Sequence, residues 1–291
     1  MIAQQLVYGV ILGMVYALLA VGYSLVFGIL RLLNMSHGSV YAFGAHMALM
    51  AVTLTWGLPA AFIFTIVATG VLNVVINNVV LAPLRARNAP NITLLISVTG
   101  VSYIIQNGLM LTFGSTRMPF PKIFDYGNIT IGGVTITSTQ LSILIVTLLL
   151  FAILFLITNC TKMGLAMRCS SQNPKAANLV GIDVRKVVTF TFFLSGMSAA
   201  IAGYMIAGYY EMVYFTMGTA AGLKAFAAAV LGGIGVLYGS VAGGVIVGIA
   251  EAMATTFLGS NYAEASAYVI LFLVLLLKPS GLFGKDNLEK V

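Results

Sequence analysis

Few residues of this sequence could do chemistry, because only 7% of its 291 residues are charged. It contains no phosphate-binding G-x-x-x-x-G-K-[ST] loop, and the nearest stretch, residues 281–285, has a different spacing. It also contains no Ser/His/Asp grouping, no H-x-x-x-H pair and no cluster of carboxylates. We therefore expect no catalytic residues, no metal site and no cofactor bound by this chain. We also expect that the chain does not hydrolyse ATP itself.

One candidate site is a polar break in the apolar first part of the chain. It contains Asn34, Ser36, His37 and Gly38. Irregular backbone at membrane depth is tolerated where it lines a cavity, and discontinuous helices often hold transported solutes. The other interpretation is a simple cytoplasmic turn that follows Arg31. Both interpretations remain open from the sequence.

Two titratable residues lie inside other apolar segments, His46 and Glu251. A lone intramembrane histidine is more typical of a hydrogen bond between helices than of a proton relay. An intramembrane carboxylate is a functional candidate by default, and the nearest cation that could pair with Glu251 is Lys224. Glu251 could instead be neutral or face a cavity. The candidates for a transport pathway are thus Asn34, Ser36, His37, Gly38, His46 and Glu251.

The composition indicates which elements must position these residues. Hydrophobic residues make up 60% of the chain and the mean hydropathy is +1.05, whereas a soluble domain has about 25% charged residues. The apolar runs reach the length of a membrane-spanning helix and lack the short alternating segments of a membrane barrel. We predict an all-α polytopic membrane protein with eight to ten transmembrane helices, nine being favoured. Residues 1–291 form a single transmembrane domain.

The predicted spans leave three cationic segments and one polar loop between them. The spans cover roughly residues 5–30, the run that ends near 56, 60–82, 91–113, 141–158, 188–209, 222–236, 240–257 and 263–277. The positive-inside rule places the loops 83–88 and 162–186 and the C-terminal tail in the cytoplasm, and the N-terminus outside. Residues 114–140 then form an extracytoplasmic loop with a small hairpin. The net charge of +7 is explained by these loops and does not indicate nucleic-acid binding.

Residues 162–186 carry five of the fourteen cationic residues and contain a small helix with its own start and stop signals. Asn173 is an N-cap candidate, Pro174 fits the first helical position, and Gly181 can end the helix. Asp183 can then cap the next helix. A capped two-turn helix between two spans has the shape of a docking element. Its docking residues are predicted to be Asn173, Pro174, Lys175, Ala176, Ala177, Leu179 and Gly181.

Glycines recur at a spacing that brings helices together. Gly235, Gly239 and Gly243 are four residues apart, and Gly244 and Gly248 form a neighbouring stripe. Small residues at this spacing let helices approach closely within lipid. We interpret the stripes as packing contacts within the chain. The alternative is a dimer face or a moving contact.

Three of these stretches together resemble the permease subunits of branched-chain amino acid ABC importers, specifically the shorter of the two paired permeases. Residues 21–41 resemble the first signature of that family, which usually reads Asn-Phe-Ala-His-Gly-Glu and here reads Asn-Met-Ser-His-Gly-Ser. Residues 164–182 are similar to the loop that docks into the ATPase, with Lys175 in place of the usual acidic residue. Residues 231–244 are similar to the glycine-rich segment of the family.

The resemblance implies an ABC importer permease fold and a set of partners. It implies that two ATP-binding cassette subunits hold ATP-Mg and dock at residues 173–181. It further implies a second homologous permease subunit and an extracytoplasmic solute-binding protein, for which the 114–140 loop is a contact. The chain would lie among the lipids of a bacterial or archaeal plasma membrane, with its C-terminus in the cytoplasm. It would form the translocation pathway for branched-chain amino acids.

The sequence leaves three other functions open. The same machine could carry urea, short amides or another amino acid. A proton-coupled secondary transporter or channel would use Glu251 and His46 as titrating groups. A membrane scaffold is the third alternative, although a scaffold would need neither Glu251 nor the polar break.

Overall fold

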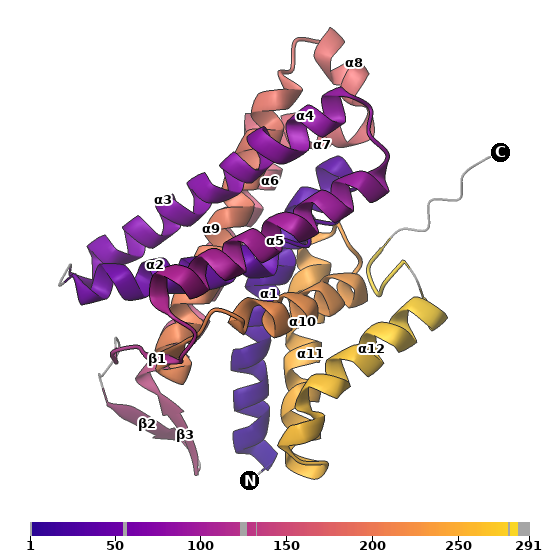
Figure 1. Cartoon of the computed structure of the whole chain (residues 1–291). Coiled ribbons are helices and arrows are strands. Elements are labelled where there is room, and N and C mark those ends of the chain that lie inside the picture. Colours follow the sequence, from indigo (N-terminus) through magenta and orange to yellow (C-terminus); the bar gives the residue numbers. More distant parts are fainter. Residues whose placement is uncertain (1, 55–56, 123–126, 132, 279, 285–291) are drawn as a thin grey trace.

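The computed structural model describes residues 2–54, 57–122, 127–131, 133–278 and 280–284 as a bundle of helices (Figure 1). In these residues, seven helical segments are long and apolar enough to cross a membrane: Ile2–Leu30, Leu58–Ala86, Asn91–Phe113, Ser138–Cys160, Val184–Tyr210, Leu237–Phe257 and Ser260–Leu277. The bundle also contains two shorter helices, α2 (His37–Thr53) and α10 (Met217–Gly232), of which α10 is a shorter apolar helix. The predicted all-α polytopic class is therefore confirmed.

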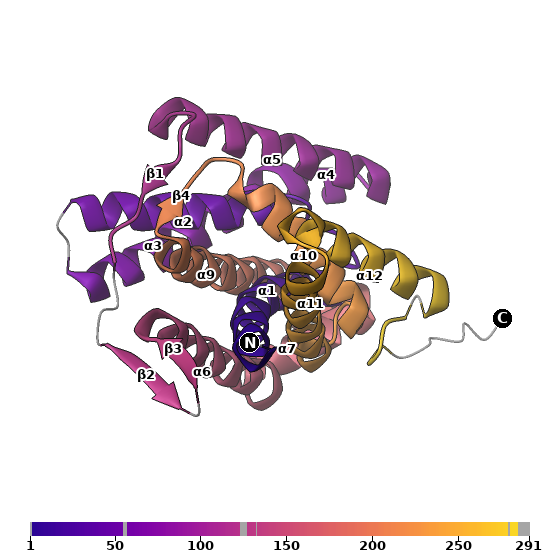
Figure 2. The same cartoon turned by 90° about the horizontal axis from the view of Figure 1, so that it is seen from below.

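Helix α1 (Ile2–Leu30) lies at the centre of the bundle. It contacts α9 (Val184–Tyr210), α10 and α11 (Leu237–Phe257), which surround it in the end-on view of Figure 2. The most apolar windows of α1 and α9 are 78% and 83% buried, compared with 6% for the span that ends at Leu277. A helix that is apolar on all sides is expected in such an interior position.

The outer helices present apolar side chains to their surroundings. They are α3 (Leu58–Ile76), α5 (Asn91–Phe113), α6 (Ser138–Cys160) and α12 (Ala263–Leu277), which follows the short 3₁₀ turn Ser260–Tyr262. Ile104 of α5 and Leu277 of α12 are 72% and 77% exposed. Such surfaces suit contact with lipid or with another membrane subunit.

The third span contains a turn that the sequence analysis did not predict. The π-helical segment Asn77–Leu81 joins α3 to α4 (Ala82–Ala86), so the helix continues through Pro83 instead of ending near residue 82. A proline cannot donate the usual helical hydrogen bond, and a single wider turn can accommodate that loss. The guanidinium of Arg85 donates to Asn77 Oδ1 at 2.5 Å and holds this turn from the side.

The predicted polar loop after α5 contains the expected hairpin. Strands β2 (Asn128–Ile131) and β3 (Val134–Thr137) pair antiparallel, and β1 (Met118–Pro119) pairs with β4 (Met212–Val213). Thr137 and Gln140 then form a capping box that starts α6. The side-chain amide of Gln4 exchanges two hydrogen bonds with the backbone of Thr135, which ties the start of α1 to the hairpin.

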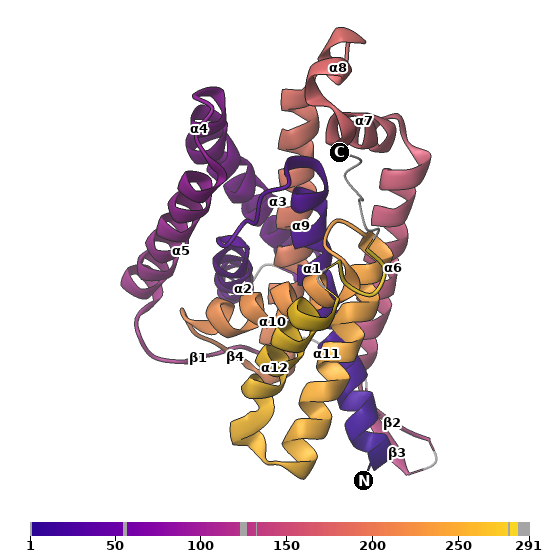
Figure 3. The same cartoon turned by 90° about the vertical axis from the view of Figure 1, so that its right-hand side faces the viewer.

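Two helices occupy the predicted cationic loop, α7 (Lys162–Gln172) and α8 (Pro174–Leu179). They lie at the end of the molecule opposite the N-terminus and the β2–β3 hairpin (Figure 3). The predicted span 222–236 is wrong at its end, since α10 stops at Gly232. Gly233 and Gly235 have φ angles of 98° and 93°, which glycine adopts without a steric penalty, and they form the turn before α11.

Candidate functional site

The polar break between α1 and α2 lies inside the molecule. Asn34, Ser36 and His37 are each at most 2% exposed. Asn34 Oδ1 accepts hydrogen bonds from the hydroxyl and the backbone N–H of Ser36, at 2.6 and 3.3 Å. Arg31 has a left-handed φ of 51°, which turns the chain after α1. The segment is thus an ordered internal turn rather than a solvated one.

His37 and Gly38 join four helices at this turn. The imidazole of His37 meets the Tyr23 ring edge-on at 4.7 Å, and its Nδ1 lies 3.4 Å from Ser195 Oγ of α9. Gly38 contacts the backbone of Gly218 and Gly222, and a Cβ on Gly38 would overlap the carbonyl oxygen of Gly218. The first turns of α2 and α10 therefore meet backbone to backbone.

Among the residues that the structure describes, His46 has no hydrogen bond to another helix of the kind that its type suggested, and its ring bonds within its own helix instead. It is 1% exposed, and its Nδ1 lies 2.7 Å from the carbonyl oxygen of Ala42, one turn earlier in α2. Its ring contacts Phe113 of α5 at a centroid distance of 4.9 Å. The contact between helices is therefore made by ring packing, because the backbone of α2 already supplies a hydrogen-bond partner.

Glu251 is paired with the cation that the sequence analysis named. Lys224 Nζ of α10 lies 2.6 Å from Glu251 Oε1 of α11, and both side chains are 9% exposed. Lys224 Nζ is also 3.5 Å from the Tyr16 hydroxyl. Glu251 Oε2 is buried and has no hydrogen-bond partner among the residues that the structure describes. Each charge of this pair compensates the other, so removing one alone would leave an unpaired buried charge.

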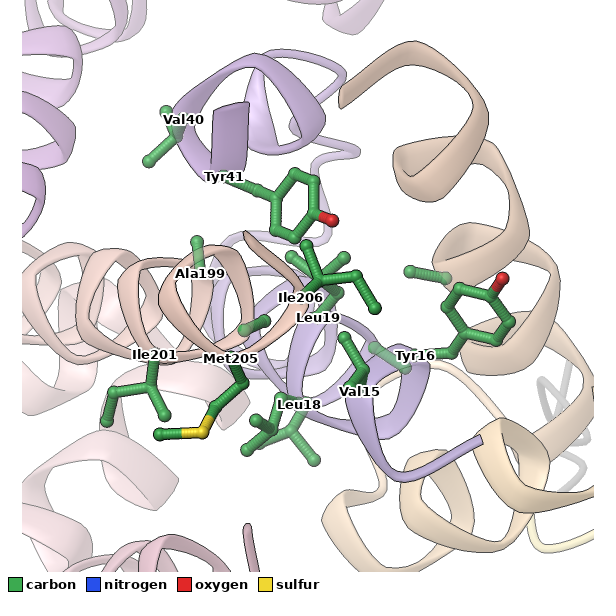
Figure 4. Close-up of a cluster of buried hydrophobic side chains, with 14 of the residues drawn as sticks. Val15, Tyr16, Leu18, Leu19, Val40, Tyr41, Ala199, Ile201, Met205 and Ile206 are labelled. Carbon is green, nitrogen blue, oxygen red and sulfur yellow. The ribbon is translucent and has the colours of Figure 1, made fainter. Parts of the chain in front are cut away.

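A cavity of about 380 Å³ adjoins Lys224 and is lined by many tyrosines. Tyr16 and Tyr41 lie at the edge of the central apolar cluster in Figure 4, with their hydroxyls directed away from it. The cavity wall combines seven groups that matter chemically: Tyr16, Tyr41, Tyr210, Tyr214, Arg117, Lys224 and Glu264. In the described residues, no group of three or more His, Cys, Asp or Glu side chains could hold a metal ion.

Helix α8 has the start and stop geometry that the sequence predicts. Asn173 Oδ1 accepts from the backbone N–H of Ala176 at 3.1 Å, Pro174 occupies the first turn, and Gly181 has a φ of 87°. Ala177 is buried, whereas the two neighbouring apolar side chains Leu179 and Val180 are 89% and 76% exposed. The helix is therefore anchored on one face and presents apolar groups on the other.

Asp183 lies between α8 and α9 and prepares the start of α9. Asp183 Oδ1 accepts from the backbone N–H of Lys186 at 3.1 Å and caps α9. This hydrogen bond holds the pKa of the Asp183 carboxyl below its usual value. Asn178 and Arg185 share a hollow of about 710 Å³ with Arg85 at the end of the third span. The α8 end of the molecule is therefore positively charged beside the exposed apolar groups.

A match that runs over nearly the entire chain decides the family. Residues 5–278 match the family described as "Branched-chain amino acid transport system / permease component". The chain belongs to this family of permeases.

Full-length relatives of this permease come from bacteria and an archaeon. The permease protein BraD of Pseudomonas aeruginosa is 36% identical over 99% of this chain and 97% of its own length. LivH of Escherichia coli K12 is 37% identical, with the same coverage, and LivH of Methanocaldococcus jannaschii is 30% identical over 92% and 88%. A solved structure titled PsaBC from Streptococcus pneumoniae covers 96% of this chain and 92% of its own, with 13% identity and a TM-score of 0.49.

The glycine stripes of the permease make contacts within the chain. Gly239 and Gly243 lie against the backbone of α10, and Gly244 and Gly248 lie against α1 at Ala17 and Gly13. Gly235 is in the turn before α11 and lies near Gly28. Added Cβ atoms at positions 239, 243, 244 and 248 would overlap backbone atoms, so these glycines permit the close approach of α11 to both neighbours.

The tyrosines, Arg117 and Glu264 of the cavity were missed in the sequence analysis. They come from α1, α2, α9, the segment before β1, the segment after β4, and the start of α12. No short motif connects these segments. The available signal was limited to the two intramembrane charges, Lys224 and Glu251, which mark the cavity from one side.

Proposed function

We propose that this permease is a transmembrane subunit of an ATP-driven importer and forms a pathway for branched-chain amino acids. The supporting observation is the full-length likeness to BraD and LivH, whose names describe high-affinity branched-chain amino acid transport system permease proteins. The pairing of Glu251 with Lys224 and the bond of His46 to its own helix give no support to proton-coupled transport.

In this proposal α8 receives the ATPase. Two ATP-binding cassette subunits, one for each permease of the pair, hold ATP-Mg and hydrolyse it, and this chain contributes no catalytic group. Leu179 and Val180 supply the exposed apolar contacts, and Asn173, Lys175 and Gly181 shape and border them. Closure of the ATPase subunits would move α8 and, through its short link to α9, the core of the bundle.

The other partners are assigned by position. The exposed apolar faces of the outer helices suit lipid and a second homologous permease. A solute-binding protein would approach the end that carries the β2–β3 hairpin and the N-terminus, which we place outside the plasma membrane. Among the pathway candidates, Glu251 lies beside the tyrosine-lined cavity and His46 supports α2. Gly38 forms the α2–α10 junction, next to the buried turn that contains Asn34, Ser36 and His37.

The test is leucine-stimulated ATPase activity and leucine uptake in proteoliposomes that contain the ATPase subunits, the second permease and the binding protein. The proposed ATPase contact would bury Leu179, and an aspartate there is expected to cost about 2 kcal/mol of binding free energy. Leu179→Asp should therefore weaken ATPase association about thirtyfold and abolish stimulation. Leu165→Asp carries the same substitution and is the matched control, because Leu165 is an exposed leucine of the neighbouring α7 and lies outside residues 173–181.

Two results would contradict the proposal. Full stimulation in the Leu179→Asp variant would exclude α8 as the coupling element. Absence of leucine uptake by the wild-type assembly, together with uptake of another solute, would exclude the branched-chain substrate.

A further inference from the structure

The tyrosine-lined cavity has an exposed mouth and a buried inner end, and its mouth is directed away from α8. Arg117 and Glu264 are exposed at its mouth, whereas Tyr41, Tyr16 and Lys224 at its inner end are 2%, 6% and 7% exposed. Figure 3 shows β1, which directly follows Arg117, and the start of α12, which contains Glu264, in the half of the molecule that also holds the hairpin. The volume of about 380 Å³ is at the small end of the range for small-molecule sites.

The charges around the cavity balance. Arg117 and Lys224 are cations, Glu264 is an anion on the same wall, and Glu251 is paired with Lys224. A ligand with a net charge would add an unbalanced charge beside the buried Lys224–Glu251 pair, which is costly. A zwitterion adds one charge of each sign and keeps the balance.

The signs of these charges suit the two ends of an amino acid head group. The Lys224 ammonium has three donors, of which one is used for the 2.6 Å bond to Glu251 and another makes a long 3.5 Å contact with Tyr16. It can therefore donate to a carboxylate without releasing Glu251. Glu264 and the tyrosine rings can attract an ammonium group.

The rest of the wall is apolar. Ile206, Met212 and Met217 face the cavity together with two alanines of α10. Methionine side chains are flexible and adapt to irregular shapes. This part of the wall offers an aliphatic side chain a dry surface, whereas it offers a polar side chain no hydrogen-bond partner.

Resting on the function proposed above, we propose that this cavity is an outward-facing binding site, within this one chain, for a zwitterionic amino acid with an aliphatic side chain. Lys224 and Arg117 bind the carboxylate, Glu264 binds the ammonium group, and the Ile206–Met217 side of the wall contacts the aliphatic group.

The experiment is equilibrium binding of radiolabelled L-leucine to the full chain in lipid nanodiscs, with no ATPase subunit or binding protein present. Two analogues of leucine serve as competitors: 3-methylbutylamine lacks the carboxylate, and 4-methylpentanoate lacks the ammonium group. Each should compete at least about tenfold more weakly than unlabelled leucine. Equal competition by either analogue would overturn the proposal.

Variants at the mouth test the site without disturbing the fold. Arg117→Gln and Glu264→Gln should each weaken leucine binding about tenfold. The matched control is Lys122→Gln, because Lys122 is an exposed cation of the same loop that pairs with Glu211 instead of lining the cavity. Unchanged affinity in both mouth variants would overturn the proposal.

The inner end needs a paired substitution, because Lys224→Met alone leaves Glu251 uncompensated. The double variant Lys224→Met/Glu251→Met removes both charges and should lose leucine binding while it keeps a cooperative thermal transition. Retained binding in this variant would exclude Lys224 as a ligand.

Failure of the site and failure of the importer give different results. If the wild-type chain binds no leucine but the reconstituted importer takes it up, the proposed function stands and the site is wrong. If the chain binds leucine but the importer does not transport it, the site stands and the proposed function is wrong.

Discussion

At the scale of single residues, the Lys224–Glu251 pair is expected to neutralise two buried charges while adding little to the net stability of the fold. Its two charges are buried at a separation of 2.6 Å, and such pairs gain little over apolar residues of similar size. We predict that Glu251→Met lowers the free energy of unfolding by about 3–5 kcal/mol, whereas Lys224→Met/Glu251→Met recovers most of that loss. A double-mutant cycle on the unfolding of the chain in detergent would measure this, and additive losses would contradict it.

Gly38 gives a second prediction at this scale. Alanine at this position would overlap the carbonyl oxygen of Gly218, so α2 and α10 would have to separate. We expect Gly38→Ala to destabilise the chain by about 1–3 kcal/mol and to lower leucine uptake. Gly108→Ala in α5 is the control, since its Cβ would meet no atom within 4 Å and alanine favours a helix. A thermal midpoint of Gly38→Ala equal to that of the control would refute the contact.

At the scale of elements, α8 depends on its N-cap, because a helix of six residues has few hydrogen bonds of its own to hold it. The N-cap hydrogen bond of Asn173 stabilises the helix by about 1 kcal/mol. Asn173→Ala should therefore increase the fraction of molecules in which α8 is frayed, and lower stimulated ATPase activity about fivefold. Asn173→Ser keeps a capping oxygen and should behave like the wild type. Equal loss in the two variants would show that the asparagine side chain acts by contact with the ATPase instead of by capping.

The elements also show what could be read from the sequence. The α8 caps were predictable, because Asn173, Pro174 and Gly181 act within nine consecutive residues. The π-turn at residues 77–81 was missed because it depends on how Asn77 meets Arg85 about two turns later. The cavity was missed for a stronger reason. Its wall joins residues from position 16 to position 264, and side chains that meet only after α1, α9, α10 and α12 assemble leave no local pattern.

At the scale of the whole molecule, the two proposed sites lie at opposite ends. Helix α8 is at one end, with cationic residues from the third span and from α7 to α9. The start of α12, which contains the mouth residue Glu264, lies toward the other end with the β2–β3 hairpin (Figure 3). Lys and Arg are enriched on the cytoplasmic side of membrane proteins. The orientation that follows places the α8 end with the ATPase and the cavity mouth with the source of the solute.

This orientation can be measured with single cysteines in a Cys160→Ser/Cys169→Ser background. Thr130→Cys lies in the exposed hairpin and Lys175→Cys on exposed α8. A membrane-impermeant maleimide should label Thr130→Cys in intact spheroplasts, and should label Lys175→Cys in inverted vesicles alone. The opposite pattern would place α8 outside, where no ATPase could reach it. Because the cavity mouth would then face the cytoplasm, that result would remove the outward-facing site as well as the coupling helix.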